Sequence, residues 1–301
     1  MRYVFIVNPV AGKKNPYGSV YPLMQEYFHQ NGMECTCHIT NQPRQATELA
    51  RQQGEKGDPV RIYAVGGDGT LSEVAAGAVG LNHVEVGVIP CGSGNDFVKS
   101  FGPIKNFLSP EKQLAAKSQK IDMIESDGQY SINLCSIGMD AKVAYEMVKF
   151  KDIPYISGPA AYNLALVKVL LGKIGDRLKV EIDGERTCEG RYLFALAGNG
   201  RYYGGGYCGA PKALPDDGLL DFILVKKPPL YQIPGLVKIY KEGGHLDSPA
   251  FKTLVTFRRG REMKVTAFKP VIANFDGECR ALEQVSFRAV PGAVRFIVPS
   301  P

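Results

Sequence analysis

Features that would mark a membrane-spanning, secreted or zinc-binding protein are missing from this sequence of 301 residues. No uncharged apolar run reaches the ~20 residues that a membrane-spanning helix needs. The N-terminal stretch MRYVFIVNPV has no long apolar segment followed by a small-residue cleavage site, so we expect no signal peptide. The seven cysteines are odd in number and scattered, with one close pair at Cys35 and Cys37, which favours reduced thiols in the cytoplasm over disulfides or a zinc site.

Several common signatures of catalytic sites are also missing. The lysine-containing segment NPVAGKK (8–14) fits neither the Walker A pattern G-x-x-x-x-G-K-[ST] nor G-x-G-x-x-G. Its four histidines, at positions 29, 38, 83 and 245, show no H-x₃-H spacing and no setting typical of a catalytic triad, so we expect packing or surface roles for them. The net charge of +6 is mildly basic, which is compatible with an anionic substrate or surface and proves neither.

The first 120 residues alternate between strand and helix patterns. Short apolar runs that end in turn residues are typical of buried strands, and segments with helical spacing lie between them. The expected strands are residues 3–9, 33–40, 60–67 and 84–90, and the expected helices are 19–32, 44–57 and 71–80, with a further helix beginning at 94. Alternating units of this kind predict an α/β domain with a parallel sheet covered by helices on both faces. In such sheets ligands bind at the carboxyl ends of the strands.

The pattern changes after Lys120. Residues 121–138 look like two strands joined through a tight turn, one helix is expected at 159–172, and many short strands follow. This pattern predicts a mainly β sandwich or barrel. We expect domains at 1–120 and 121–291, and the last run, AVRFIVP, can return to either domain, so that residues 292–301 can complete the first.

A glycine-rich loop with one acid lies between the third expected strand and the helix that follows it. Residues 64–74 read AVGGDGTLSEV. This position directs backbone N–H groups and a helix N-terminus at a ligand, which favours anions. The glycines at 66, 67 and 69 let phosphate oxygens approach the main chain, and Asp68 makes sense if it reaches a Mg²⁺ that itself holds phosphate. The alternative is a plain strand-to-helix turn whose glycines serve only positive φ angles.

Two further strand ends carry polar loops that contain glycine. In PCGSGNDF (90–97), Ser93 and Asn95 can bind phosphate or sugar oxygens, although plain helix capping explains the segment about as well. In NPVAGKK (8–14), the two lysines can neutralise phosphate. Because the carboxyl ends of parallel strands share one edge of a sheet, we expect the three loops to converge.

Two carboxylates lie close together near the end of the chain, in NFDGE (274–278). In an extended segment, residues two apart face the same side, so Asp276 and Glu278 would point together. Two close carboxylates tend to raise one pKa, which suits proton abstraction from an alcohol. The alternative is a hairpin turn at Asp276-Gly277.

A second acidic segment reads LPDDGLLD (214–221). Its acids at 216, 217 and 221 make an oxygen-rich site that a hard cation would occupy. The alternative is a β-turn around Gly218 with no ligand.

Three other segments also leave alternatives open. RYYGGGY (201–207) is either a flexible lip over a substrate or only a loop. RRGR (258–261) is a small basic cluster for which a solvated hairpin is favoured over contact with anionic lipid. The expected helix at 159–172 is apolar on more than one face, which favours burial in the core over a lipid-facing wall.

Taken together, the motifs resemble those of the soluble diacylglycerol kinase family, which includes bacterial lipid kinases and, more distantly, sphingosine and ceramide kinases. The resemblance rests on NPVAGK, VGGDGTLSEVAAG and PCGSGNDF, and it continues in order through NLCSIGMDAKV (133–143), APKALPDDGLLDF (210–222) and NFDGE. GGDGT alone is shared with NAD kinases and phosphofructokinases, whereas the ordered set is far more specific and covers nearly the whole chain. The resemblance implies an ATP-binding α/β domain of the NAD kinase or phosphofructokinase type at 1–120 and a β-sandwich domain for the lipid substrate at 121–291.

The resemblance also implies where the ligands bind. ATP would lie in a cleft with its phosphates over GGDGT. The implied nucleotide contacts are Asn8, Pro9, Gly12, Lys13, Thr40, Gly66, Gly67, Asp68, Gly69, Thr70, Leu71, Ser72, Glu73, Ser93 and Asn95. In bacterial members one aspartate and two backbone carbonyls hold a structural Mg²⁺, and these positions fall here on Asp217, Leu214 and Leu219. The general base would be Glu278 or Asp276, and Asp68 would act on the ATP phosphates and their metal.

We therefore predict an ATP-dependent, Mg²⁺-requiring kinase that phosphorylates a lipid hydroxyl, with diacylglycerol first among the candidates. One alternative is an NAD kinase-like nucleotide kinase, which shares GGDGT but is not expected to carry NPVAGK or GSGND. The other is a non-catalytic nucleotide-binding regulator, against which the acids at 68, 217, 276 and 278 argue. The predicted partner is a lipid at the membrane surface, with peripheral contact at the inner face, and no nucleic acid. A homodimer is compatible with the sequence, which does not give the oligomeric state.

Overall fold

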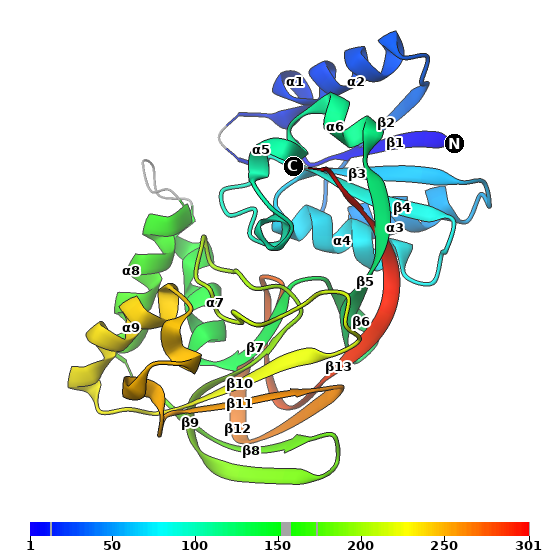
Figure 1. Cartoon of the computed structure of the whole chain (residues 1–301). Coiled ribbons are helices and arrows are strands. Elements are labelled where there is room, and N and C mark those ends of the chain that lie inside the picture. The colour runs from blue at the N-terminus through cyan, green and yellow to red at the C-terminus, as the bar shows by residue number, and fades with distance from the viewer. Residues whose placement is uncertain (13, 152–157, 173, 301) are drawn as a thin grey trace. The chain divides into compact units, whose positions relative to one another are not determined.

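The computed structural model describes residues 1–12, 14–151, 158–172 and 174–300 (Figure 1). Lys13, an expected nucleotide contact, lies outside the described residues. The chain divides into two compact units, one made of Met1–Met123 with Pro291–Pro301 and the other of Ile124–Val290. These divisions fall close to residues 120 and 291, where the sequence pattern changes.

The first unit is built around a parallel sheet with the strand order β4-β3-β1-β2. β1 (Arg2–Val7) pairs with β2 (Cys35–Ile39) and with β3 (Val60–Gly66), and β3 pairs with β4 (Val84–Pro90). The last part of β13 (Glu278–Val298) lies parallel to β4, so the run near the C-terminus belongs to this sheet. The α/β class predicted for this part of the chain is confirmed.

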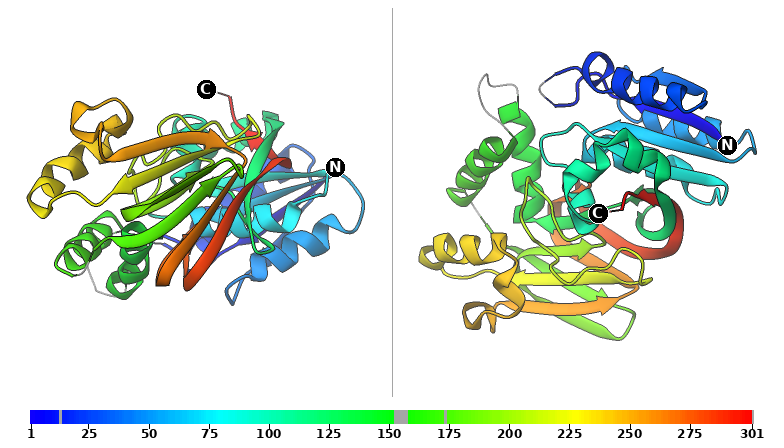
Figure 2. Two further views of the ribbon diagram at one scale, coloured as in Figure 1. Left: turned by 90° about the horizontal axis from the view of Figure 1, so that it is seen from below. Right: turned by 45° about the horizontal axis from the view of Figure 1, so that its top comes forward.

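Helices cover both faces of the parallel sheet, as Figures 1 and 2 show. α2 (Tyr21–Gln30) and α6 (Pro110–Ala115) lie on one face, and α3 (Gln45–Gly54) and α4 (Asp68–Ala78) lie on the other. The remaining helices of this unit are short: α1 (Pro16–Ser19), the 3₁₀ turn η1 (Phe97–Ser100) and α5 (Ile104–Phe107). The helix expected from residue 94 is therefore a single 3₁₀ turn.

Aromatic side chains fill the layer between the sheet and α2. Phe5 stacks on Tyr63 with ring centroids 5.2 Å apart, and Phe28 meets Phe5 edge-on at 5.5 Å. All three rings are fully buried. Pairs of this geometry contribute about 0.5–1.5 kcal/mol each beyond the burial of their area. Because successive side chains of a strand point to opposite faces of the sheet, alternate residues of β1 and β3 direct these rings toward α2.

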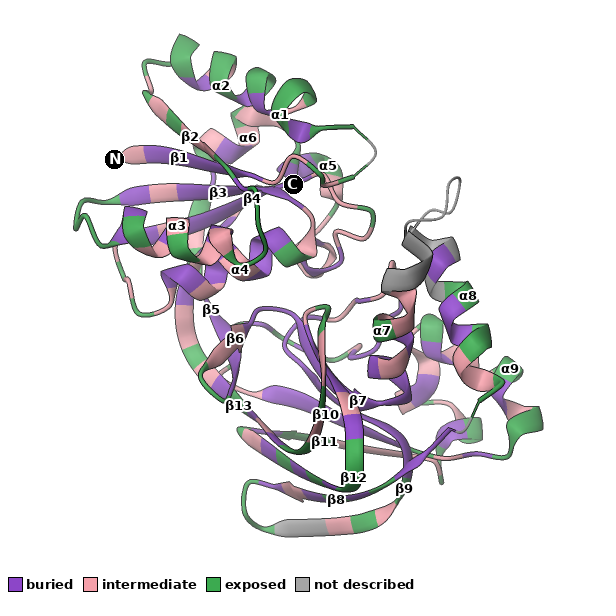
Figure 3. Ribbon diagram, turned by 180° about the vertical axis from the view of Figure 1, so that it is seen from behind, coloured by how far each residue is buried: buried purple, intermediate pink, exposed green. Residues whose placement is uncertain are grey.

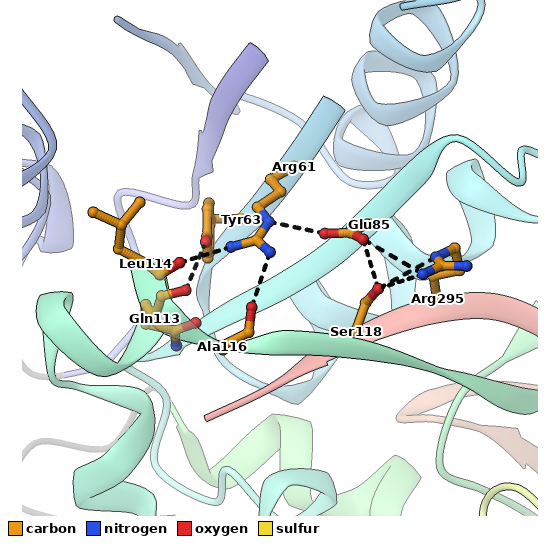
Figure 4. Close-up of polar contacts among 8 residues, drawn as sticks. All are labelled: Arg61, Tyr63, Glu85, Gln113, Leu114, Ala116, Ser118 and Arg295. Atoms are coloured by element: carbon orange, nitrogen blue, oxygen red, sulfur yellow. Dashed lines mark hydrogen bonds and ion pairs between the residues drawn. The ribbon is translucent and has the colours of Figure 1, made fainter. Parts of the chain in front are cut away.

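A largely buried polar network ties distant segments to the parallel sheet (Figure 4). Arg61 Nε donates to Glu85 Oε2 at 2.8 Å, and its other nitrogens donate to two backbone carbonyls at the end of α6. Ser118 Oγ donates to Glu85 Oε1 at 2.6 Å, and Arg295 donates to Ser118 Oγ. Burial disfavours the charged form of Glu85, but the hydrogen bonds from Ser118 and Arg61 outweigh it and lower the pKa of this carboxyl. The network fixes the start of β5 (Lys117–Ser126) and the end of β13 against β3 and β4.

The second unit is mainly antiparallel. Two long strands, β9 (Arg186–Gly198) and β12 (Glu262–Phe275), each pair with β7 (Leu134–Gly138) along one part and with β8 (Asp176–Ile182) along another. Because each long strand contributes to two sets of pairs, the strands wrap around a shared apolar core that includes Val180, Met263 and Phe287. Figure 3 shows the buried stretches along these strands. The predicted β-sandwich architecture is confirmed.

The other strands extend this arrangement. β10 (Leu220–Lys226) pairs with β9, and β11 (Val255–Gly260) pairs with β10. β13 pairs with β12 through the turn at residues 276–277, and β6 (Gln129–Ser131) pairs with β5.

Three helices pack on the sandwich and form a second apolar cluster with it. α8 (Gly158–Leu170) corresponds to the expected helix at 159–172, whereas α7 (Met139–Lys151) and α9 (Ile233–Lys241) were not predicted. α9 contains Pro and Gly in its first turn, which disfavour a helix in a sequence pattern although Pro is tolerated there. Three 3₁₀ turns complete the unit: η2 (Leu230–Gln232), η3 (Gly244–Leu246) and η4 (Pro249–Phe251).

Candidate active site

The glycine-rich loop after β3 forms the first turn of α4. Gly67 is the N-cap residue and Asp68 is the first helical residue, so the helix begins three residues before the position expected from the sequence. The first N–H groups of a helix have no intrahelical acceptor, and the helix dipole makes this end electropositive. The turn therefore offers backbone donors to an anion, and an added Cβ at Gly69 would meet no atom within 4 Å.

Asp68 connects this turn to the polar loop that follows β4. Its Oδ1 accepts hydrogen bonds from the backbone N–H groups of Asp96 at 2.7 Å and Phe97 at 3.1 Å. The carboxylate thus caps η1, the turn that follows the loop at 91–95. The sequence did not reveal this contact, because the two segments are 28 residues apart.

Three loops of the first unit meet backbone to backbone. A Cβ at Gly67 would lie 3.1 Å from Gly92 Cα, and a Cβ at Gly92 would lie 2.5 Å from Gly67 Cα. Gly12 has a φ of +72°, and a Cβ there would lie 2.1 Å from the carbonyl oxygen of Cys91. Only glycine permits these approaches. The structure therefore brings together the loops after β1, β3 and β4, and it gives the glycines a packing role in addition to the predicted approach of phosphate.

Several predicted nucleotide contacts hold these loops in shape. Asn8 Nδ2 donates to Thr70 Oγ1 at 3.2 Å, which links the first and second loops. The Asn95 side chain closes its own loop by accepting from Gly92 N at 3.0 Å and donating to Gly92 O at 2.9 Å. Thr40 N donates to the carbonyl of Val7 at 2.9 Å. These contacts hold the residues at the loops around the site, and their roles toward ATP stay predictions.

The other predicted contacts differ in their surroundings. Ser93 is exposed, whereas Leu71 and Ser72 are buried within α4. Glu73 Oε2 accepts from the backbone N–H of Ala46 at 3.2 Å, so this carboxylate lies at the N-terminus of α3. Pro9 and Gly66 lie at the ends of β1 and β3 beside the loops.

The DGE segment is a hairpin and not an extended strand. β12 ends at Phe275, β13 begins at Glu278, and Asp276 and Gly277 form the turn with φ angles of 49° and 103°. The expectation that Asp276 and Glu278 face one side by strand alternation is therefore wrong, because the chain reverses between them. The Glu278 side chain is exposed. Which of the two acids takes a proton stays a prediction.

The Asp276 carboxylate holds the start of β7. It accepts from the backbone N–H groups of Ile132 at 2.6 Å, Asn133 at 3.1 Å and Leu134 at 2.8 Å. Asn133 in turn donates to the carbonyl of Tyr202 at 2.9 Å, so the clamp extends to the loop at 201–207. Three backbone donors therefore occupy the oxygens of Asp276, which gives this carboxylate a structural role.

The DDGLLD segment forms a turn into β10. Asp217 Oδ1 accepts from Leu219 N at 3.0 Å, and its Oδ2 lies 3.5 Å from Arg259 Nη1. Arg259 Nε also donates to Asp221 Oδ1 at 2.7 Å. Burial raises the pKa of Asp221 although the contact with Arg259 acts against it. Among the residues that the structure describes, no group of three or more His, Cys, Asp or Glu side chains offers a metal site.

An apolar pocket of about 50 Å³ lies within the second unit, between α7, α8, α9 and the strands β9 and β10. One acid lines it: Asp140 is 3% exposed, and its Oδ2 accepts from Ser136 Oγ at 2.7 Å. Tyr203 and Tyr207, from the RYYGGGY loop, are buried in the wall, so this loop packs and is not only an exposed connection. The apolar wall comprises Met139, Leu166, Leu193, Phe194, Tyr203, Tyr207, Val225, Pro228, Ile233, Leu236, Val237, Tyr240 and Phe251.

Two family models match the chain one after the other. Residues 2–126 match the diacylglycerol kinase catalytic domain, and residues 133–298, more than half of the chain, match the YegS C-terminal NAD kinase beta sandwich-like domain. The chain belongs to the diacylglycerol kinase family. Membership makes it an ATP-dependent lipid kinase, in agreement with the prediction from the motifs. The first match ends at residue 126 and the second begins at residue 133, both close to the division of the kinase at residues 123–124.

Individual relatives agree with the family models. The kinase is 27% identical over 276 residues to the diacylglycerol kinase of Bacillus subtilis (strain 168), which covers 91% of this chain and 88% of the relative. It is 28% identical over 275 residues to the diacylglycerol kinase of Staphylococcus haemolyticus (strain JCSC1435), covering 91% and 81% of the two chains.

Solved structures show the same fold. A crystal structure of a diacylglycerol kinase from Bacillus anthracis str. Sterne matches with a TM-score of 0.70 at 19% identity, over 100% of this chain and 97% of that chain. An NAD kinase from Archaeoglobus fulgidus in complex with ATP matches with a TM-score of 0.54 at 12% identity, over 99% and 93%. None of the helices in the described segments combines the length and apolar character needed to cross a membrane.

Proposed function

We propose that this kinase transfers the γ-phosphoryl group of ATP, bound as its Mg²⁺ complex, to the hydroxyl group of diacylglycerol and so forms phosphatidic acid. The observation that carries the proposal is the convergence of three loops on the N-terminus of α4, in a chain whose two segments both match this family. The lipid acceptor follows from the relatives, which are named for diacylglycerol.

The ATP phosphates are proposed to lie over the first turn of α4. Its N–H groups and the open space at Gly69 suit phosphate oxygens, and the exposed hydroxyl of Ser93 adds a donor from the third loop. Asp68 orients the third loop through Asp96 and Phe97 and brings negative charge toward the metal of MgATP. Asn8, Pro9, Gly12, Lys13 and Thr40 are proposed contacts from the loops that follow β1 and β2.

The apolar pocket of the second unit is proposed to receive part of an acyl chain. Burying hydrocarbon there contributes about 0.8 kcal/mol per CH₂ group. Its volume of about 50 Å³ is smaller than a whole chain, so α8 and α9 must move apart as the lipid enters. Asp140, the acid in the wall, provides an acceptor for a polar group of the lipid.

The chemistry is proposed to be in-line transfer. The lipid hydroxyl oxygen attacks the γ-phosphorus, the bond from that phosphorus to the bridging oxygen of ADP breaks, and Glu278 takes the hydroxyl proton. Glu278 is favoured over Asp276 because its side chain is exposed, whereas three backbone N–H groups occupy Asp276. Asp276 would then act by fixing the segment at 132–134.

The acceptor is tested by transfer from labelled ATP onto a panel of lipids dispersed in detergent. We expect product with diacylglycerol and little or none with sphingoid bases, ceramide, phosphatidylglycerol or prenols. Transfer to NAD with none to any lipid would favour a nucleotide kinase, and ATP binding without turnover would favour a regulator.

We also propose peripheral contact with the inner membrane face, which co-sedimentation with vesicles of known composition measures.

A further inference from the structure

The turn at residues 214–219 is held by an arginine from the neighbouring strand. Arg259 on β11 lies directly opposite Asp221 on β10 in the antiparallel register, so the two side chains leave the sheet on the same face. Nε of Arg259 donates to Asp221 Oδ1 at 2.7 Å. Asp221 is only 1% exposed, so the guanidinium provides a positive charge to a buried acid.

The same guanidinium also reaches the turn itself and the residues just before it. Nη1 lies 3.5 Å from Asp217 Oδ2, and Nη2 donates to the backbone carbonyl of Lys212. One planar group therefore contacts two carboxylates and one carbonyl oxygen, which is the kind of oxygen set that a divalent cation gathers. Arginine suits this work because its charge is permanent and its donors have a fixed geometry.

The residues do not fit a divalent ion at this turn. Of the two oxygens of Asp217, Oδ1 accepts from Leu219 N at 3.0 Å and Oδ2 faces the guanidinium. A second cation bound to this carboxylate would lie beside the positive charge of Arg259 and would be repelled by it. Asp221 Oδ2 is buried and has no hydrogen-bond partner among the described residues, but Arg259 Nε already contacts the other oxygen of that carboxylate at 2.7 Å, so a second cation there would meet the same repulsion. The backbone carbonyls of Leu214 and Leu219 are neutral ligands, which alone bind Mg²⁺ weakly.

We propose that the Arg259 guanidinium is the resident cation of this turn and takes the place of the structural Mg²⁺ that relatives are expected to bind there. The order of the turn then does not depend on free metal. The Mg²⁺ that accompanies ATP is a separate requirement, so metal should affect turnover without affecting the stability of the nucleotide-free protein.

The test is thermal unfolding of the nucleotide-free full chain in EDTA and in millimolar MgCl₂. For wild type we expect the same Tm in both, within about 1 °C, because a contribution of 1 kcal/mol would move Tm by roughly 2–4 °C in a unit of this size. Arg259→Ala should lower Tm in EDTA and recover part of the loss in MgCl₂, since the freed acids then accept the ion. Arg258→Ala is the matched control: Arg258 is the adjacent residue on β11, and its Nη1 donates to the carbonyl of Phe257 at 2.9 Å. This variant should behave as wild type in both buffers.

Three results would overturn the proposal. The first is a wild-type Tm that rises by several degrees with MgCl₂. The second is an Arg259→Ala variant that melts with Arg258→Ala. The third is an Arg259→Ala variant whose Tm ignores MgCl₂. If Arg259→Ala does not fold, the comparison of wild type in the two buffers still tests the proposal. Arg259→Lys keeps the positive charge but loses the planar guanidinium, so this variant should fold and should melt below wild type. Because the readout is unfolding, these outcomes do not depend on which substrate the kinase uses.

Discussion

Asp276→Asn should destabilise the second unit by about 2–4 kcal/mol, through loss of the clamp on the start of β7. Oδ2 accepts from Ile132 at 2.6 Å and Asn133 at 3.1 Å, and Oδ1 accepts from Leu134 at 2.8 Å. Asparagine keeps one acceptor oxygen and turns an NH₂ group toward the donors of the other. At least one backbone N–H therefore loses its acceptor, at about 1–3 kcal/mol, and the remaining bonds lose the charge that made each worth about 1.5–3 kcal/mol.

The substitution isolates these hydrogen bonds because it adds no backbone strain. Asp276 has a φ of 49°, a region that asparagine tolerates well. Asp127→Asn is a matched control: Asp127 precedes a glycine in the same kind of turn with a φ of 48°, and its carboxylate contacts Arg280 at 3.6 Å. We expect this control to stay within about 0.5 kcal/mol of wild type.

Calorimetry measures the difference directly. With each kcal/mol worth roughly 2–4 °C in a domain of this size, the second unit of Asp276→Asn should melt roughly 4–16 °C below wild type. Turnover at a temperature below both transitions separates the two roles of the residue. If Asp276→Asn melts with wild type, the clamp contributes nothing and the reasoning fails. If it melts with wild type and also loses turnover, Asp276 takes the proton itself.

Four further outcomes are expected. Glu278→Gln should keep its Tm and its affinity for ATP while kcat falls by roughly 10²–10⁴, the range for loss of a general base, and an unchanged kcat would remove it from the mechanism. Gly67→Val should lower both Tm and ATP affinity, because its side chain would push against Gly92, at about 1–3 kcal/mol for such overpacking; Gly69→Ala, in open space, should keep its Tm. Leu166→Trp should fill the apolar pocket and raise KM for long-chain diacylglycerol, and Leu164→Trp, exposed on the same helix, should not; equal KM values would place the lipid elsewhere. Burial lowers the pKa of His245 to about 4, so the folded state binds fewer protons than the unfolded chain between that pH and about 6.5. The free energy of unfolding should therefore fall as the pH drops through this window, and the slope of Tm against pH should flatten in His245→Phe. An unchanged slope in this variant would contradict the prediction.

The parallel sheet could be predicted because its signals are local. Strands such as Val84–Pro90 are continuous apolar runs bounded by turn residues, and the observed bounds match the expected 84–90. The sequence pattern predicts the start of α4 at residue 71 because glycine and aspartate disfavour helices in general, whereas at the first turn Asp68 suits the helix dipole. α7 and α9 were missed because packing on the sandwich, rather than a clean periodic pattern, stabilises them.

The sequence predicts which segments form the candidate site, but it does not predict which residues of these segments contact one another. The motifs identified the three loops, but the bond from Asp68 to Phe97 and the clamp from Asp276 to Ile132 join segments 29 and 144 residues apart. The hairpin at Asp276-Gly277 was recognisable from its residues, and the extended alternative conflicted with that local signal. Arg259 belonged to a basic cluster that the sequence favoured as a solvated hairpin. Its position opposite Asp221 depends on the register of two strands, which no local pattern gives.

The most direct measurement compares phosphoryl transfer from ATP to diacylglycerol and to NAD by one preparation of the kinase, with the lipid product identified by mass spectrometry. Asp68→Ala serves as the blank, because this residue is proposed to position the loops and the metal of MgATP. The account predicts phosphatidic acid formation by wild type, a kcat/KM for diacylglycerol far above that for NAD, and no product from Asp68→Ala. Phosphorylation of NAD without phosphatidic acid, or equal turnover by wild type and Asp68→Ala, would contradict it.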